Sequence, residues 1–459
     1  MIGGAVLRRL AVATAIALPG VPAAAQSAWQ PPALTITRYD EDWSGLAHAS
    51  DPARWTERLK YVPLGGDAYL TTGIEARARD ESYRDNLWGD GPAPDDGYLW
   101  LRLMPYADLH VGQLRAFVQP IAAYAVGVAG GPGPIDQTRV DLLQGFADAT
   151  VRVGGDATVT LRGGRQMLSL GTERLVGTRY GPNVPLAFDG FRALFETGGT
   201  TVNFLAAEPV RPGPGSFDDR SSAAKSLWGV YATRPGFDLY YLGYRNRRAQ
   251  FDAGSGEERR HSIGLRSFGT AHDWHWNVEA VVQLGRLGDQ RIRAWTIGSE
   301  LGRHLRDVPF KPDLMMRFNM VSGDTKRGDG TLGTFNALFP KGKYFGELSP
   351  IGPYNIVNLN PGVTLDLGGN VSAGLMGQFY WRYASADGIY DVPGNLVRSA
   401  GTARSRFIGR QIEATADWQA TPELDLSVSL SGFAPGAFIR ETGPARAIAM
   451  LGLEANYRF

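Results

Sequence analysis

The stretch Arg446-Ala-Ile-Ala-Met-Leu-Gly-Leu-Glu-Ala-Asn-Tyr-Arg-Phe459 decides the fold. Successive side chains of a β-strand point to opposite faces. One face of this stretch carries Ala, Leu, Tyr and Phe, and the other carries Gly452, Glu454 and Asn456. A strand of about ten residues with one apolar and one polar face is the unit of a transmembrane β-barrel. An edge strand of a soluble sandwich is the alternative.

The N-terminal residues have the pattern of an export signal. Arg8 and Arg9 precede the short apolar run 10–18, and Ala23-Ala-Ala25 forms an A-x-A cleavage site. This pattern is typical of a Sec-type signal peptide, and the run is too short to span a bilayer. No later stretch is an uninterrupted apolar run of about 18 residues. We predict that residues 1–25 are a signal peptide and that the exported protein has no transmembrane helix.

The composition excludes several classes of chemistry. The 459 residues include no cysteine, so there is no disulfide framework and no thiolate ligand or nucleophile. The formal net charge of +1 indicates no class of partner. Glycine-rich phosphate loops and basic-aromatic nucleic-acid surfaces are absent from the sequence. The 59 glycines and the dispersed 18 Tyr, 11 Trp and 20 Phe suit an all-β protein with aromatic girdles.

The strand period recurs along the chain, for example in 69–80, 98–111, 276–284 and 424–430. Short turns such as Gly368-Gly-Asn370 alternate in order with longer polar segments, as in outer-membrane barrels. The predicted loops are 81–97, 126–138, 168–187, 211–224, 247–258, 286–290, 322–353, 386–404 and 434–445.

These patterns predict an all-β, transmembrane, antiparallel up-and-down β-barrel of about 18 strands, with long extracellular loops and short periplasmic turns. A count of 16 stays open because 140–152 and 188–197 alternate less cleanly and 286–290 is short for a loop. The barrel would occupy 68–459. Residues 26–67 would form an N-terminal periplasmic segment at the mouth or inside the lumen, with a short helix near 52–61.

Several segments resemble the alginate-export family of outer-membrane barrels. The most specific match is the loop DGTLGTFNALFPKGKYFGE, residues 329–347. Shorter matches extend over nearly the whole exported chain. They are Asp42-Trp43-Ser44, 58–65, 95–98, Gly164-Arg165-Gln166, 180–183, Phe188-Asp189-Gly190, 217–220, 392–395 and 440–444.

The resemblance implies a monomeric outer-membrane barrel that passes an acidic polysaccharide, alginate, through a pore lined by arginines and some carboxylates. Residues at matching positions would line this pore. They are Glu75 with Arg77, Arg165 with Gln166, Asp189 with Arg192, and Arg382.

Strand parity extends this set of lumen charges. The inward basic residues are predicted as Arg77, Arg79, Arg102, Arg115, Arg152, Arg162, Arg192, Arg266, Arg317 and Arg382. The inward acids are predicted as Glu75, Asp108, Asp148, Glu196, Glu279, Asp313, Asp366, Glu413, Asp417 and Glu454. Because the two sets are comparable in number, anion selectivity would require the arginines to cluster at the narrowest part of the pore. Pairing across strands is the alternative.

The predicted pore-lining residues are Glu75, Arg77, Arg102, Arg115, Arg162, Arg165, Asp189, Arg192, Arg317, Arg382 and Glu413. Parity is uncertain at Gly163-Gly164, where a bulge would exchange the faces of Arg162 and Arg165.

Catalysis is the rival class of function. The six histidines are His48, His110, His261, His272, His275 and His304. None stands with a Ser or Asp in a defensible catalytic arrangement, so we predict no enzyme activity, no catalytic residue, no cofactor and no metal site. The acidic residues of 324–329 lack the spacing of a calcium loop, which favours a solvated loop.

We therefore expect a passive outer-membrane channel for an anionic polysaccharide or oligosaccharide of the alginate type. A general or nutrient-uptake porin for small organic solutes, or a barrel whose loops bind a surface partner, are the alternatives. The expected partners are the solute, outer-membrane lipids and the assembly machinery, which would recognise Phe459; export would add a periplasmic partner.

Overall fold

The strands bury alternate residues, as β2 (Ala68–Arg84) illustrates. The computed structural model describes residues 29–48 and 54–459. In β2, Glu75, Arg77 and Arg79 are buried, whereas Ala76 and Ala78 between them are partly exposed on the other face. The polar face therefore points into the barrel and the apolar face points outward, as the sequence predicts.

In the described residues, the main sheet has 21 strands, of which three are short additions. The other eighteen form the wall. They are β2, β3 (Asp96–Val111), β4 (Leu114–Val126), β5 (Arg139–Gly154), β6 (Ala157–Met167), β7 (Ala187–Thr197), β8 (Thr200–Arg211), β10 (Lys225–Arg234), β11 (Phe237–Phe251), β12 (Gly254–Ala271), β13 (Trp274–Leu287), β14 (Gln290–His304), β15 (Asp313–Val321), β17 (Ile356–Gly368), β18 (Val371–Arg382), β21 (Phe407–Gln419), β22 (Leu424–Pro435) and β23 (Ile448–Arg458). The smaller elements are β1 (Val62–Gly65), β9 (Arg220–Ser221), β16 (Thr331–Leu332), β19 (Ile389–Tyr390), β20 (Leu396–Arg398), η1 (Ser44–His48), η2 (Trp55–Leu59), η3 (Asn86–Gly89) and α1 (Ala437–Thr442).

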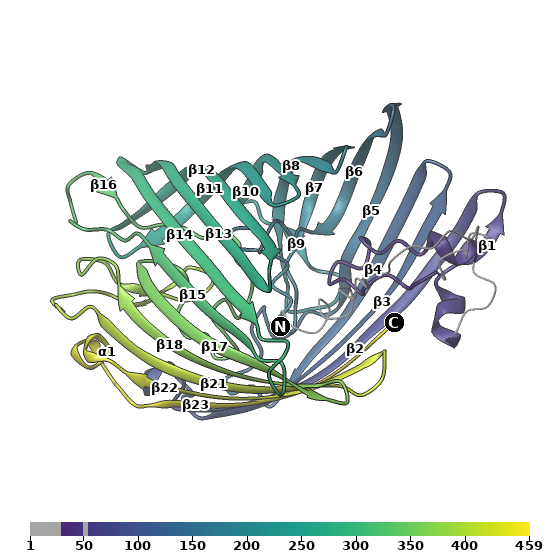
Figure 1. Ribbon diagram of the computed structural model, residues 1–459. Helices are drawn as coiled ribbons and strands as arrows, with labels where there is room; N and C mark the ends of the chain where they lie inside the picture. Colours follow the sequence, from purple (N-terminus) through teal and green to yellow (C-terminus); the bar gives the residue numbers. More distant parts are fainter. Residues whose placement is uncertain (1–28, 49–53) are drawn as a thin grey trace.

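The wall closes where β23 pairs with β2. The antiparallel register runs from Glu75 opposite Arg458 to Arg84 opposite Ala449. Figure 1 shows the strands curving round until β23 lies beside β2. In hydrocarbon every backbone donor and acceptor must be paired, and a closed sheet leaves no edge. The predicted closed antiparallel barrel of 18 strands is confirmed, and the count of 16 is wrong.

Two of the predicted loops, 247–258 and 286–290, are instead the ends of β-hairpins. The segment 247–258 is almost entirely strand, since β11 and β12 are joined by residues 252–253 alone, and β13 and β14 are joined by 288–289. Polar composition suggests a loop, but Arg247, Arg248 and Gln250 lie on the exposed side of a strand whose other face buries Ala249 and Phe251 in the apolar cluster inside the barrel. The ion pair Arg245–Glu257 stabilises one of these extended hairpins.

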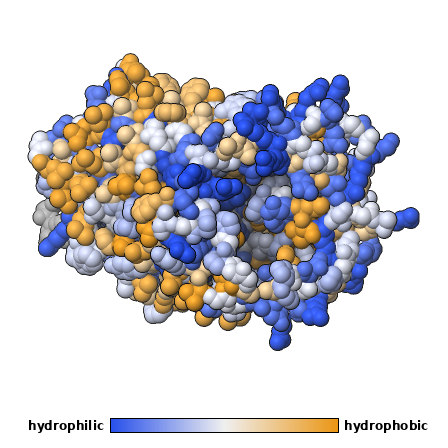
Figure 2. Space-filling view, turned by 180° about the vertical axis from the view of Figure 1, so that it is seen from behind, coloured by the Kyte–Doolittle hydropathy of each residue, from blue (hydrophilic) through white to orange (hydrophobic). Residues whose placement is uncertain are grey.

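The loops 168–186 and 322–355 fold into the barrel and meet there. Val176 and Phe339 form a parallel bridge, and the Phe339 amide donates to the Leu175 carbonyl at 2.8 Å. The largest cluster of buried apolar side chains surrounds this junction, with Phe335 and Tyr354 among its members. The apolar core of the molecule therefore lies inside the wall. Figure 2 shows a hydrophilic hollow between apolar wall surfaces.

The N-terminal residues also enter the lumen. Tyr39 packs edge-on against Phe146 at 5.2 Å between ring centroids and donates its hydroxyl to the Met167 carbonyl at 2.7 Å. The Arg38 guanidinium donates to the Phe459 carbonyl at 2.7 Å. The helix expected near 52–61 is the 3-10 helix η2. The predicted signal peptide, residues 1–25, lies outside the described residues. In the described part of the chain, no helix has the length and apolar character needed to cross a membrane.

Candidate functional site: the lumen

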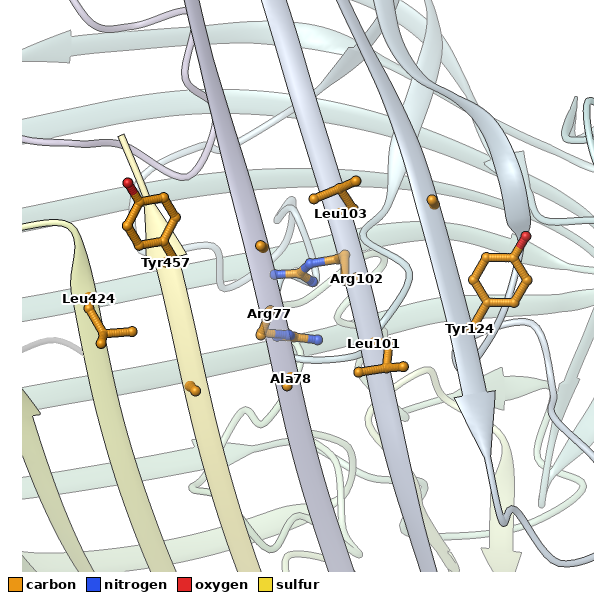
Figure 3. A pocket seen from close by; sticks show the side chains of 11 residues that line it. Arg77, Ala78, Leu101, Arg102, Leu103, Tyr124, Leu424 and Tyr457 are labelled. Atoms are coloured by element: carbon orange, nitrogen blue, oxygen red, sulfur yellow. The ribbon is translucent and has the colours of Figure 1, made fainter. Parts of the chain in front are cut away.

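Arg77 and Arg102 point from neighbouring strands into the lumen. Figure 3 shows Leu101, Leu103 and Tyr457 on the near, outward face of the wall, with the two guanidinium groups behind the strands. This separation follows from strand alternation. The outward leucines and tyrosine suit lipid, so the charged chemistry belongs to the interior.

The guanidinium groups of Arg77 and Arg102 bind the loop 168–186. Both donate to the Tyr180 carbonyl, at 3.2 and 3.1 Å, and Arg102 also donates to Glu75 at 2.7 Å. Both side chains are buried. A buried guanidinium needs several acceptors to offset its desolvation, and the loop carbonyls supply them. These three predicted residues therefore anchor a loop inside the lumen.

Arg382 holds the loop between β18 and β21 in the same way. Its guanidinium makes five hydrogen bonds to the carbonyls of Ser385, Asp387, Ala403 and Ser405, and it is fully buried. Within the described residues it has no carboxylate within 4 Å. The guanidinium therefore binds the loop and is not accessible to a solute.

Glu413 fixes the large infolded loop. It accepts the amides of Glu347 and Leu348 at 2.8 and 3.3 Å and the Ser431 hydroxyl at 2.9 Å. Among the described residues no basic side chain lies within 4 Å of it. Glu413 thus acts as a docking point for backbone amides.

Arg115, Arg162 and Arg192 converge on Tyr39 of the N-terminal segment. Arg115 donates to the Tyr39 carbonyl at 2.6 Å, Arg192 lies 3.4 Å from its hydroxyl, and Arg162 stacks over its ring at 4.3 Å. Arg115 and Arg162 also pair with lumen carboxylates, Asp108 at 2.6 Å and Asp148 at 2.7 Å. The three arginines thus surround one aromatic side chain, and two of them are paired with carboxylates.

Arg165 and Asp189 pair with each other at 2.8 Å on the other face of the wall. Arg165 stands three residues from the inward Arg162, and Asp189 stands two residues from Phe191, which is 74% exposed. The structure therefore does not bring these two predicted residues to the lumen face. The side chains of β6 keep alternating between the two faces through Gly164, whose φ is +135°, so no bulge exchanges the faces of Arg162 and Arg165.

A buried charge network that involves the large loop was missed from sequence. Arg79 pairs with Glu454 at 2.7 Å and Glu347 at 2.6 Å, and Lys343 pairs with Glu347 at 2.7 Å and Glu81 at 3.1 Å. Lys343 and Glu347 lie within the segment 329–347 that was singled out only as a family match. Its two lysines, in a chain where most basic residues are arginine, were an available signal.

Three further cations of the lumen, Arg174, Arg317 and Lys341, are partly exposed. Arg174 pairs with Glu279 at 3.1 Å and Arg317 with Glu300 at 2.6 Å. Lys341 has no carboxylate within 4 Å among the described residues, although its side chain is half-buried. Burial, and then repulsion from the Arg317 cation, lower the pKa of Lys341 to about 8. The three residues are near enough to interact electrostatically, and two of them have a carboxylate partner within 4 Å.

A closed barrel with an apolar exterior and charged loops in its lumen is the architecture of a bacterial outer-membrane channel. The family model for alginate export matches residues 68–451, and the chain belongs to this family. Comparison with curated protein sequences finds no match.

Solved structures of similar fold come from Pseudomonas aeruginosa. OccK2 (OpdF), crystallised with glucuronate, is 10% identical over 85% of this chain and 98% of its own, with a TM-score of 0.55. OpdK is 12% identical over 84% and 98%, with a TM-score of 0.55. OpdO is 14% identical over 87% and 98%, with a TM-score of 0.56. At these identities the likeness establishes the shared barrel fold.

Proposed function

We propose that this outer-membrane channel passes a carboxylated saccharide, an alginate-like uronate oligomer or polymer. The observation that carries the proposal is the group of Arg174, Arg317 and Lys341, in which Lys341 has no carboxylate within 4 Å among the described residues. A cation inside a low-dielectric wall attracts anions and raises their local concentration. The family membership, and the glucuronate bound by one structural relative, support a uronate as the solute.

Single-channel recording of the reconstituted protein tests the proposal. We expect the reversal potential in a salt gradient to indicate anion preference, and Lys341→Glu to shift it toward cations. Lys326→Glu is the matched control, because Lys326 lies exposed in the same loop and the charge change is the same. Cation preference in the unaltered channel, or equal shifts in both variants, would contradict the proposal.

Uptake of small organic acids is a second candidate. The junction of the loops 168–186 and 322–355 inside the lumen favours a small solute, since a polymer must pass beside packed loops. Block of the current separates the two candidates. Polyuronate that blocks at lower concentration than free glucuronate favours the saccharide chain, and the reverse order favours the small acid. A reconstituted barrel without conductance would favour loops that bind a surface partner.

We also propose that Phe459 is recognised by the assembly machinery before the barrel closes. Its ring lies 5.4 Å from that of Trp55, and its carbonyl accepts the Ile74 amide at 3.3 Å. Phe459→Ala is expected to lower the yield of assembled barrel in cells more than it lowers the stability of the purified protein.

A further inference from the structure

Two imidazoles and a carboxylate meet at the periplasmic end of the lumen. His275 of β13, His304 of β14 and Asp313 of β15 come from three neighbouring strands. Asp313 Oδ1 lies 2.9 Å from His275 Nε2 and 3.4 Å from His304 Nδ1. The available ligand atoms of all three lie within 4.8 Å of one another.

Strand alternation places all three side chains on the lumen face. His275 stands four residues before Glu279, and His304 stands four residues after Glu300; both of these carboxylates bind inward arginines. Asp313 stands four residues before Arg317 on the same face of β15. The side chains are 20%, 32% and 28% exposed, respectively for His275, His304 and Asp313. The cluster is therefore open to ions from the periplasm.

In the part of the chain that the structure describes, Asp313 has no arginine or lysine partner. In the described residues the ionisable groups within 4 Å of it are the two imidazoles alone. Four other lumen acids have an arginine partner: Asp108 has Arg115, Asp148 has Arg162, Glu279 has Arg174 and Glu300 has Arg317. With neutral imidazoles the cluster carries one negative charge and offers nitrogen lone pairs. That donor set suits a soft or borderline divalent cation.

The backbone beside the cluster makes room for it. A Cβ atom on Gly302 would lie 2.2 Å from His275 Nε2. Real Cβ atoms do not approach this closely, so any other residue at 302 would displace the imidazole from its position over β14.

We propose that His275, His304 and Asp313 form a binding site for a divalent transition-metal ion of the Zn²⁺ type. Ligand atoms about 2.0–2.1 Å from a tetrahedral ion lie about 3.4 Å apart. One of the two measured separations already has this value, and the other must open by about half an ångström. The fourth position is left to water. This metal-site proposal does not depend on which solute the channel carries.

Metal binding would change the charge of the lumen mouth. The ion adds two positive charges next to Asp313, on the lumen face that Arg317 also occupies four residues further along β15. Zn²⁺ added to the periplasmic side should therefore alter the single-channel current at low ionic strength, where charges are least screened. Mg²⁺ and Ca²⁺ should not reproduce the effect, because they require more oxygen ligands than the cluster offers.

Isothermal titration of the full-length barrel in detergent with Zn²⁺ tests the site. We expect one Zn²⁺ per chain, and at least a tenfold loss of affinity in His275→Ala and in His304→Ala. His110→Ala is the matched control, because His110 also faces a carboxylate, Asp108, but that carboxylate is held by Arg115. No binding by the unaltered protein, or undiminished binding by the double variant His275→Ala/His304→Ala, would overturn the proposal.

A measurement on the unaltered protein covers the case in which the variants fail to fold. Diethyl pyrocarbonate modifies accessible imidazoles, and mass spectrometry identifies the modified residues. We expect Zn²⁺ to protect His275 and His304 while the exposed His272 stays reactive. Equal modification of all three with and without Zn²⁺ would refute the site.

Discussion

At the scale of single residues, the lumen arginines divide by what accepts their hydrogen bonds. Arg77, Arg102 and Arg382 donate to loop carbonyls, whereas Arg174 and Arg317 donate to carboxylates and remain partly exposed. Strand parity finds inward arginines but cannot distinguish these groups, because the acceptors come from loops distant in sequence. A buried guanidinium surrounded by carbonyls stabilises structure, and a partly open one is available to a solute.

Replacement of Arg382 by lysine should loosen the loop between β18 and β21 without changing ion selectivity. Lysine has three donors on one nitrogen and cannot reach four carbonyls arranged around a planar fork. We expect a loss of about 2 kcal/mol of local stability, measured as faster trypsin cleavage within 383–406. The exposed Arg404→Lys should leave the cleavage rate unchanged. A cleavage rate equal to that of the unaltered protein would show that the carbonyl contacts of Arg382 do not hold the loop.

The pKa of Lys341 makes anion preference depend on pH. Burial and the Arg317 cation lower this pKa from 10.5 to about 8, so the ammonium form dominates below that pH and the neutral amine above it. Anion preference should therefore fall as the pH rises from about 7 to 9. Reversal potentials of the unaltered channel and of Lys341→Met check this expectation. The methionine variant should be nearly flat over the same range; an equal slope in both would assign the titration to another group.

At the scale of elements, the N-terminal segment, residues 29–48, lies in the lumen with Tyr39 packed against the wall. Tyr39 lies between Phe117 and Phe146, 5.9 and 5.2 Å between ring centroids, with the Arg162 guanidinium over its ring. Aromatic and cation–π contacts of this kind depend on a single side chain. The Tyr39 side chain is therefore one of the buried contacts, with that of Arg38, that hold the segment in the lumen.

Tyr39→Ala should release the N-terminal segment and enlarge the channel. Loss of a buried aromatic ring costs about 3 kcal/mol, which shifts docking by about two orders of magnitude. Larger single-channel conductance, or more frequent open events, is the expected result. Ile36→Ala, in the same segment but partly exposed, serves as the control. Unchanged conductance in Tyr39→Ala would mean that the segment does not obstruct the path.

The wall strands were predictable from sequence, whereas the interior was not. Period-two alternation is local, so β2 and β23 can be recognised from their own residues. The junction of Val176 with Phe339 joins residues far apart in the chain, and no local pattern encodes it. The segment 247–258 was wrongly predicted as a loop because polarity outside the membrane does not distinguish loop from strand. The cluster of His275, His304 and Asp313 depends on the register of three strands, which follows only from the pairing.

At the scale of the whole molecule, ion pairs join the strand that closes the barrel to the first strand and the large loop. Glu454 of β23 accepts a bond from Arg79 of β2 at 2.7 Å, and the same guanidinium reaches Glu347 at 2.6 Å. The seam of the wall and the position of the loop are thus coupled through one arginine.

Glu454→Ala should weaken closure of the barrel. Removal of one partner from a buried ion pair leaves an unmatched charge and costs about 3 kcal/mol, the low end of the usual range because Arg79 keeps Glu81 and Glu347. A lower temperature of the heat-induced mobility shift on detergent gels measures this loss. The exposed Glu196→Ala provides the comparison. Equal transition temperatures for both variants would show that the seam does not depend on the pair.

The bond from Arg38 to the Phe459 carbonyl links the docking of the N-terminal segment to closure of the barrel. The acceptor stands directly after β23, so it reaches its place only when β23 has paired with β2. The contacts of Tyr39 with Phe117, Phe146 and Met167 do not involve β23 and so can form before the wall closes. Closure of the wall then adds the last anchor of the N-terminal segment, at Phe459.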